Sequence, residues 1–206
     1  VVHGMTIGEY ANMINGEKWL NNKVQCSLNV IPCLNYDHST RYILPVPPSP
    51  NLPNMRSIYL YPSLCFFEGT NVSIGRGTDF PFQVFGAPYF NKTQFSFTPH
   101  ATYGAKYPKH KLKTCYGLDL RILSIDSLQH INKLNFKWLV NSYRLSKESE
   151  DFFNKNNFFN LLAGSDKLMN LVKGGANASH IYDTYQKDLK DYKIIRKRYL
   201  IYKDFE

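Results

Sequence analysis

The sequence predicts an α+β fold in which strands come first and helices follow. Short apolar runs bounded by glycine, proline and polar residues dominate residues 1–125, and apolar residues recur at helical spacing from residue 126 onward. Strands followed by helices are typical of α+β domains. At 206 residues the chain can bury a sizeable core. We therefore expect a strand-rich part, 1–125, and a helical region, 126–206, packed on it as one compact domain.

A short helix is predicted over residues 7–16. Thr6 and Glu9 have capping-box spacing, Gly16 suits a helix end, and we therefore assign Glu9 a structural role. Loose alternation over 24–34 then predicts a strand, followed by an extended piece at 41–44.

The prolines of segment 45–53 exclude both a regular helix and a central strand. This segment is either a linker or a rigid wall that positions Ser49 and Asn51. Residues 58–67 are apolar and predict a buried helix or strand. Three further strands are expected, with a basic loop at 106–113 between the second and the third: 80–87, 94–98 and 114–125.

Four helical segments are expected after residue 125. The first is capped by Asp126 or Ser127 and continues to Tyr143. Two shorter segments cover 152–162 and 168–172, and glycines follow each of them. Ser179 caps a long last helix whose apolar stripe is a core face.

Composition narrows the classes of partner. The net charge of +9 favours anionic partners, but no nucleic-acid-binding module is visible, so we expect no nucleic-acid partner. No apolar run approaches the ~20 residues that span a membrane. The cysteines Cys26, Cys33, Cys65 and Cys115 lack zinc-site spacing, and we expect them to be buried, with one disulfide left open. We expect neither a metal nor a cofactor.

Residues 67–79 combine glycines, carboxylates, an arginine and hydrogen-bonding side chains between two apolar runs. Glycines cluster where a backbone turns tightly or approaches a ligand, so Gly69, Gly75 and Gly77 are assigned structural roles. Polar groups beside such glycines bind and protonate polar substrates. The segment therefore predicts a binding or catalytic site.

Four sequence blocks occur in a fixed order along the chain. They are His3-Gly4-Met5-Thr6-Ile7-Gly8-Glu9, Pro48-Ser49-Pro50-Asn51-Leu52-Pro53, the run 67–78 with Pro81-Phe82 and Gly86-Ala87-Pro88, and Cys115-Tyr116-Gly117-Leu118. Together they resemble the NamZ/YbbC family of bacterial exo-β-N-acetylmuramidases, formerly a domain of unknown function. The resemblance is to the C-terminal part of the family.

The resemblance implies release of N-acetylmuramic acid from the non-reducing ends of peptidoglycan fragments. It implies muramyl glycans as partners, and a Rossmann-like N-terminal half of the same protein that supplies the other side of the cleft. Secreted, periplasmic or lipid-anchored localisation is expected for the same reason. The alternative is a non-catalytic module that binds muramyl sugars.

Glu68 is the candidate catalytic residue. The apolar run before it can desolvate the carboxyl and raise its pKa toward the range of a general acid. Alternatively, Glu68 caps the glycine turn. Arg76 is assigned to the lactyl carboxylate of N-acetylmuramic acid, because a guanidinium binds a carboxylate bidentately. Its alternative is a salt bridge, with Asp79 as the candidate partner.

The remaining site assignments concern sugar contacts. Four side chains of the segment 67–79 are candidates to bind the hydroxyl or acetamido groups of a sugar. Alternatively, Asn71 and Ser73 make turn bonds to their own backbone. Two residues of the other blocks complete the substrate-binding set. The six are Thr70, Asn71, Ser73, Thr78, Asn51 and His3.

Overall fold

The computed structural model describes residues 2–90, 94–147 and 150–205 and divides into two compact units. The first unit is Ile43–Tyr182. The second joins Val2–Tyr42 to the segment that begins at Asp183. Mixed α and β structure is present, with eight α-helices and one three-stranded sheet in the described residues.

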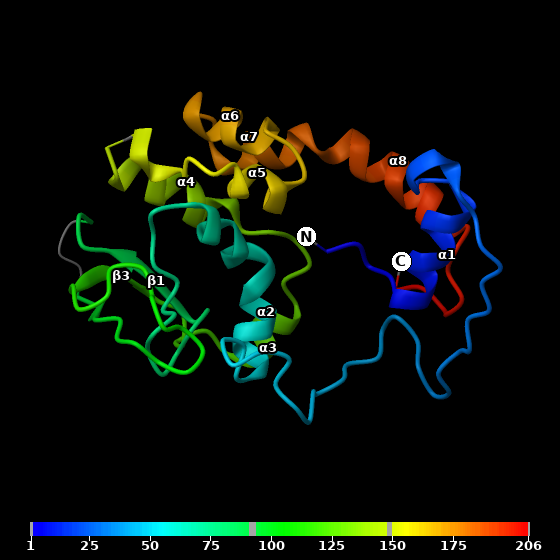
Figure 1. Ribbon diagram of the computed structural model, residues 1–206, viewed down its shortest axis with the longest axis horizontal. Helices are drawn as coiled ribbons and strands as arrows, with labels where there is room; N and C mark the ends of the chain where they lie inside the picture. Colours follow the sequence, from blue (N-terminus) through cyan, green and yellow to red (C-terminus); the bar gives the residue numbers. More distant parts are fainter. Residues whose placement is uncertain (1, 91–93, 148–149, 206) are drawn as a thin grey trace. The chain divides into compact units, whose positions relative to one another are not determined.

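The sheet of the first unit is small and antiparallel. Its strands are β1 (Val84–Ala87), β2 (Ser96–Phe97) and β3 (Cys115–Asp119), in the order β1-β3-β2. Figure 1 labels β1 and β3. Gly86 and Gly117 face each other where β1 and β3 pair. A Cβ atom on Gly117 would lie 1.9 Å from the carbonyl oxygen of Phe85, so this position requires glycine. The three strands predicted at 80–87, 94–98 and 114–125 are confirmed, although each is shorter than predicted.

Helix α2 (Met55–Leu64) leads directly into the candidate site. Asn54 and Ser57 form its capping box, and the chain then tightens into the 3₁₀ helix η2 (Cys65–Gly69). Phe67 is fully buried and stacks on Phe85 of β1, with ring centroids 5.0 Å apart. The predicted apolar element is thus helical, and its packing fixes the backbone that carries Glu68.

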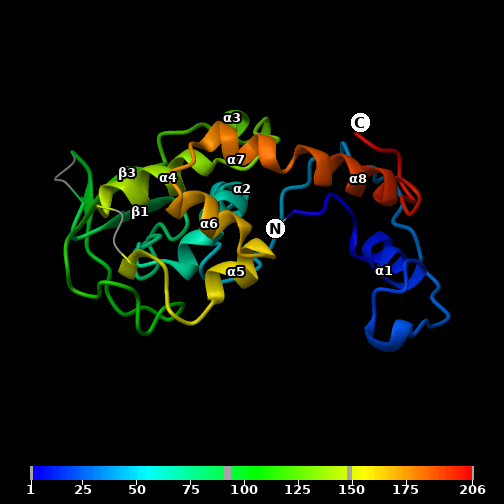
Figure 2. The same ribbon diagram turned by 90° about the horizontal axis from the view of Figure 1, so that it is seen from above.

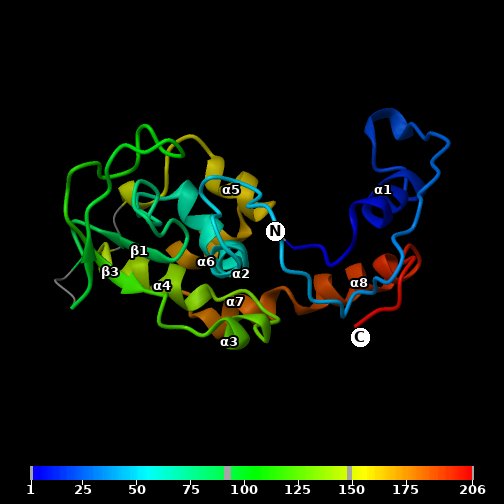
Figure 3. The same ribbon diagram turned by 90° about the horizontal axis from the view of Figure 1, so that it is seen from below.

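Five helices follow the sheet in the chain: α3 (Ile125–Gln129), α4 (Phe136–Leu145), α5 (Phe158–Ala163), α6 (Lys167–Lys173) and α7 (Ala178–Thr184). Helices α5 and α6 pack together (Figure 2), and α5 also packs on η2 just beyond α2 (Figure 3). The single helix that we predicted from residue 126 is wrong, because Ser124 caps α3 and Asn135 caps α4. The glycine ends are confirmed by Gly164 after α5 and Gly174 after α6.

The second unit contains α1 (Ile7–Gly16), α8 (Gln186–Lys197) and the 3₁₀ turn η1 (Asn21–Lys23). The predicted first helix and its Thr6–Glu9 capping box are confirmed. The predicted strand at 24–34 is wrong. The side chain of Asn15 bonds to both the N–H and the carbonyl of Cys26, at 2.9 Å each, so these groups join no ladder. In the part of the chain that the structure describes, residues 41–44 belong to no strand.

The last helix is also divided. Helix α7 begins at Ala178 rather than after Ser179, and the carboxamide oxygen of Asn177 accepts a hydrogen bond from the N–H of His180 at 2.8 Å. A second helix, α8, begins after Tyr185. The prediction of one long helix that begins after Ser179 is therefore wrong.

All four cysteines are free thiols. Cys65 and Cys115 are buried as predicted, and burial raises the pKa of Cys115 to about 12. Cys26 and Cys33 are exposed, so our expectation of burial is wrong for these two. Within the described residues no helix is long and apolar enough to cross a membrane, and no cluster of three metal-ligating side chains occurs.

Candidate functional site

The predicted segment 67–79 forms one side of a cavity of about 470 Å³ in the first unit. The opposite side comes from the loop 103–109, and Phe158 at the start of α5 completes the lining. From the predicted segment the cavity is lined by Glu68, Ser73, Ile74 and Arg76. Two of the predicted site residues that carry charge, Glu68 and Arg76, therefore meet in one hollow.

Glu68 and Arg76 form an ion pair at the cavity, with Nη1 of Arg76 lying 3.1 Å from Oε1 of Glu68. Nη2 of the same guanidinium donates a longer bond, 3.5 Å, to the carbonyl of Gly104. The Arg76 side chain is 41% exposed and that of Glu68 18%. Arg76 therefore pairs with Glu68 and not with Asp79, the partner that we had considered. The guanidinium remains accessible to an anionic ligand.

Lys109 lines the same cavity and is a functional residue that no sequence pattern indicated. Its Nζ donates hydrogen bonds to three backbone carbonyls: Phe67 at 2.8 Å, Glu68 at 3.0 Å, and Thr70. Burial lowers the pKa of Lys109 to about 8, against the opposing attraction of Glu68. The ammonium group thus holds the backbone on both sides of Glu68. No local signal distinguishes Lys109 from the other lysines of its loop.

The three hydroxyl side chains assigned to sugar contacts make turn bonds. Oγ1 of Thr70 donates to the carbonyl of Phe67 at 3.0 Å, and Oγ1 of Thr78 donates to that of Gly75 at 2.6 Å. Oγ of Ser73 accepts a bond from the N–H of Gly75 at 3.4 Å. Of these three only Ser73 lines the cavity, and it is almost fully buried.

The three glycines stand where a side chain does not fit. Gly75 and Gly77 have φ values of +75° and +86°, in the left-handed region that favours glycine. A Cβ atom on Gly69 would lie 2.4 Å from the Cα atom of Phe159 in α5. The glycines therefore permit the turn and its close packing on α5.

Asn71 and Asn51 support the walls of the cavity. The carbonyl of Asn71 accepts a bond from the hydroxyl of Tyr89 at 2.8 Å, and Nε2 of His110 lies 2.9 Å from the same oxygen. Burial lowers the pKa of His110. The Asn51 carboxamide donates a 2.8 Å bond to the carbonyl of Gly104, the group that Arg76 also reaches. Asn51 thus anchors the loop opposite Glu68.

His3 and Glu9 belong to the second unit. His3 stacks on Tyr10 with ring centroids 4.6 Å apart, and burial lowers its pKa. Glu9 is fully buried. Its Oε1 accepts bonds from the N–H groups of Ile201 and Tyr202 at 2.8 and 3.2 Å, and Nε2 of His38 lies 3.0 Å away. Burial opposes the charge of Glu9, but the hydrogen bonds outweigh it and lower the pKa.

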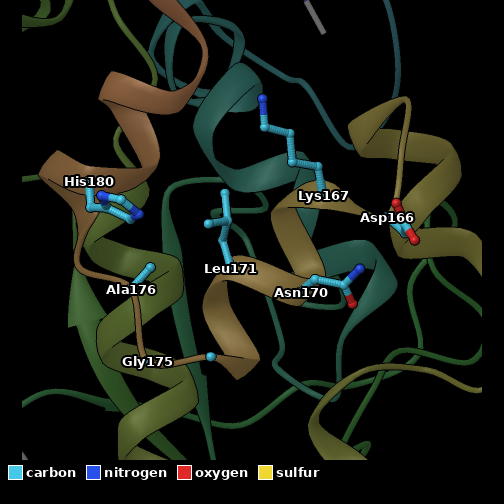
Figure 4. Close-up of a pocket in the computed structure, with 8 residues that line it drawn as sticks. Asp166, Lys167, Asn170, Leu171, Gly175, Ala176 and His180 are labelled. Carbon is cyan, nitrogen blue, oxygen red and sulfur yellow. The ribbon is translucent and has the colours of Figure 1, made fainter.

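A second hollow, of about 620 Å³, lies between α6 and α7. Figure 4 shows Asp166 and His180 on opposite sides of it, with Asn170 and Leu171 between them. None of the predicted site residues lines this hollow. The cavity at Glu68 is therefore the better candidate site, although it is the smaller of the two.

Comparisons with known proteins agree with the family that the sequence blocks indicate, but the match is not confined to the C-terminal part of that family. Residues 59–202 match the family model described as exo-β-N-acetylmuramidase NamZ, C-terminal, and residues 1–56 match the corresponding N-terminal model. The chain is 31% identical to the peptidoglycan β-N-acetylmuramidase NamZ of Bacillus subtilis, over 97% of this chain and 50% of that protein. It therefore spans about half the length of this relative.

Two crystal structures of DUF1343 family proteins from Bacteroides fragilis share the fold. One has a TM-score of 0.92 at 46% identity and covers 99% of this chain and 57% of that one. The other has a TM-score of 0.71 at 23% identity, over 97% and 56% of the two chains, and shows the fold alone. Since the C-terminal model alone matches well over half of the chain, this protein belongs to the exo-β-N-acetylmuramidase NamZ family.

Proposed function

We propose that this chain supplies one wall of the active site of a peptidoglycan-processing glycosidase that releases N-acetylmuramic acid from non-reducing ends. The main support for this proposal is the Glu68–Arg76 ion pair, which faces a cavity large enough for a sugar. The named activity of the Bacillus subtilis relative supports the same substrate class.

In this proposal Arg76 binds the lactyl carboxylate of the muramyl residue. The guanidinium is partly exposed, and its bond to the carbonyl of Gly104 is long, so a carboxylate can replace it with a bidentate pair. Glu68 lines the same cavity, and in this proposal it is the general acid that gives a proton to the leaving glycosidic oxygen.

A second carboxylate is needed for the usual glycosidase mechanisms. Among the residues that line the cavity, Glu68 is the sole acidic side chain. We propose that the second one comes from a Rossmann-like half of the same protein. The relatives' greater length supports this proposal.

A cell-wall substrate also supports secreted, periplasmic or lipid-anchored localisation. Cell fractionation followed by immunoblotting tests this part of the proposal. Recovery of the protein in the cytosolic fraction alone would contradict it.

The catalytic role of Glu68 is tested in the full-length protein with a muramyl-ended disaccharide, by measuring free N-acetylmuramic acid. Glu68→Gln keeps the size of the side chain but cannot donate a carboxylic proton, so we expect the rate to fall about 10²- to 10⁴-fold. Asp166→Asn, in the α6–α7 hollow, is the matched control and should leave the rate unchanged. An unaltered rate in Glu68→Gln would falsify the assignment.

The presence of one carboxylate in the cavity also favours an alternative, a non-catalytic module that binds muramyl sugars. This alternative predicts sugar binding that survives Glu68→Gln, with no turnover even when the N-terminal half is present. Calorimetric titration together with the turnover assay separates the two functions.

A further inference from the structure

Two tyrosines stand out on the loop that closes the cavity opposite Glu68. Tyr103 is 92% exposed and Tyr107 is 91% exposed, yet both line the cavity. Neither hydroxyl makes a hydrogen bond within the described residues. Aromatic rings that are left this open at the edge of a polar cavity are available to a ligand.

The loop that carries these rings is firmly held. Thr102 and Ala105 exchange both backbone hydrogen bonds, at 3.0 and 3.1 Å, so that Tyr103 occupies a closed turn. The carbonyl of Gly104 receives Asn51 and Arg76, as described above. Pro108 is buried, and Lys109 is fixed on the backbone around Glu68. The rings therefore project from an ordered backbone, and less conformational entropy is lost when they bind a ligand.

The charges around the rings favour an anionic sugar. Lys106 lies between the two tyrosines in the sequence and lines the same cavity, as do Arg76 and Lys109. Glu68 is the one acidic group of the lining. A sugar ring has an apolar C–H face, which packs on a tyrosine ring, and polar edges, which suit hydroxyl and ammonium groups.

We propose that Tyr103 and Tyr107 form a second sugar-binding subsite, which receives the ring adjoining the muramyl residue held by Arg76. This inference rests on the proposed function and adds a determinant of glycan length to it. The aromatic subsite consists of Tyr103, Tyr107 and the intervening Lys106. It should strengthen the binding of a disaccharide and contribute nothing to the binding of free N-acetylmuramic acid.

The test compares the affinity of the full-length protein for two probes, N-acetylmuramic acid and a disaccharide that ends in it, by calorimetric titration. All the proteins compared, the wild-type reference included, carry Glu68→Gln, so that the disaccharide is not turned over. Aromatic contacts contribute ~0.5–1.5 kcal/mol, so Tyr103→Ala and Tyr107→Ala should each weaken disaccharide binding about 2- to 10-fold. Neither variant should alter the affinity for the monosaccharide. Tyr103→Phe and Tyr107→Phe keep the rings and should restore most of the disaccharide affinity.

Ile122→Ala is the matched control, since Ile122 is an 83% exposed apolar residue of the same unit outside the cavity lining. Equal affinities of the wild type and the alanine variants for the disaccharide would overturn the subsite while leaving the proposed function intact. Loss of monosaccharide binding in the same variants would also overturn it. If the wild type binds neither probe, both the subsite and the proposed function fail.

Discussion

Replacement of Lys109 by methionine tests whether a buried ammonium group organises the backbone around Glu68. Methionine keeps an unbranched apolar stem and removes the charge. Two of the three carbonyls keep another donor, because Thr70 bonds to Phe67 and Asn154 bonds to Glu68. The carbonyl of Thr70 has no other hydrogen bond within the described residues. One unsatisfied carbonyl costs about 1–3 kcal/mol.

The pKa of Lys109 gives the cost of burying its charge, which the methionine variant does not have. Burial lowers the pKa of Lys109 from 10.5 to about 8, which corresponds to about 3 kcal/mol against the charged form in the fold. Lys109→Met no longer has to bury a charge, and this gain in the free energy of unfolding offsets the cost of the unsatisfied Thr70 carbonyl. We therefore expect Lys109→Met to fold, with a free energy of unfolding at pH 7 within about 2 kcal/mol of the wild type.

The titration of Lys109 makes the free energy of unfolding depend on pH. The folded protein releases this proton near pH 8, whereas the unfolded chain keeps it to about pH 10.5. Between these values the unfolded state binds more protons, so the stability of the wild type relative to Lys109→Met should rise with pH, by up to about 3 kcal/mol. The titration of the thiols and tyrosines is common to both proteins and cancels in the difference.

Chemical denaturation of wild type and Lys109→Met at several pH values between 7 and 10 measures this difference. Lys113→Met, which removes an exposed lysine of the same loop, is the control and should show no such change. A stability difference that stays flat from pH 7 to 10 would refute the assignment of a buried, charged Lys109.

Three further changes test other parts of the structure. Gly117→Ala places a Cβ atom 1.9 Å from the carbonyl of Phe85, so it should separate β1 from β3 and cost about 3 kcal/mol or more of unfolding free energy, measured by denaturation; a fully stable variant would contradict the close approach. Glu9→Ala leaves the N–H groups of Ile201 and Tyr202 without their acceptor and should cost about 2–4 kcal/mol at pH 7. Because the pKa of Glu9 is lowered, that loss should shrink as the pH falls below about 4.5, and a pH-independent loss would contradict it. Arg76→Ala should weaken the binding of N-acetylmuramic acid about tenfold or more, yet alter little the binding of N-acetylglucosamine, which lacks the lactyl carboxylate; equal losses for the two sugars would contradict a role in carboxylate recognition.

Local patterns account for the elements that the sequence predicted well. The helix at 7–16 is specified by Thr6, Glu9 and Gly16, which all lie within or next to it. A strand at 24–34 needs a pairing partner elsewhere in the chain, which no local pattern reveals. In the structure the Asn15 side chain bonds to the backbone of Cys26 instead. The spacing of apolar residues predicts one helix where the structure has α3 and α4. The two helices are separated by their N-caps, Ser124 and Asn135, which that spacing does not reveal.

The candidate site shows the same distinction. Glu68 and Arg76 are eight residues apart in one glycine-rich segment, so the sequence predicts one site for both, but it does not predict their ion pair. Lys109 reaches the same place from about 40 residues further along the chain, so only the fold brings it there. The hydroxyl groups of Thr70 and Thr78 illustrate the opposite error, since residues suited to sugars are as well suited to the turn itself.

A crystal structure of the Glu68→Gln variant with a muramyl-ended disaccharide would show directly where the sugar binds. We predict that the muramyl ring occupies the cavity between residues 68–76 and 103–109, with its lactyl carboxylate on the Arg76 guanidinium. A disaccharide bound in the α6–α7 hollow, or with its carboxylate away from Arg76, would show that this cavity does not recognise the muramyl residue in the proposed way.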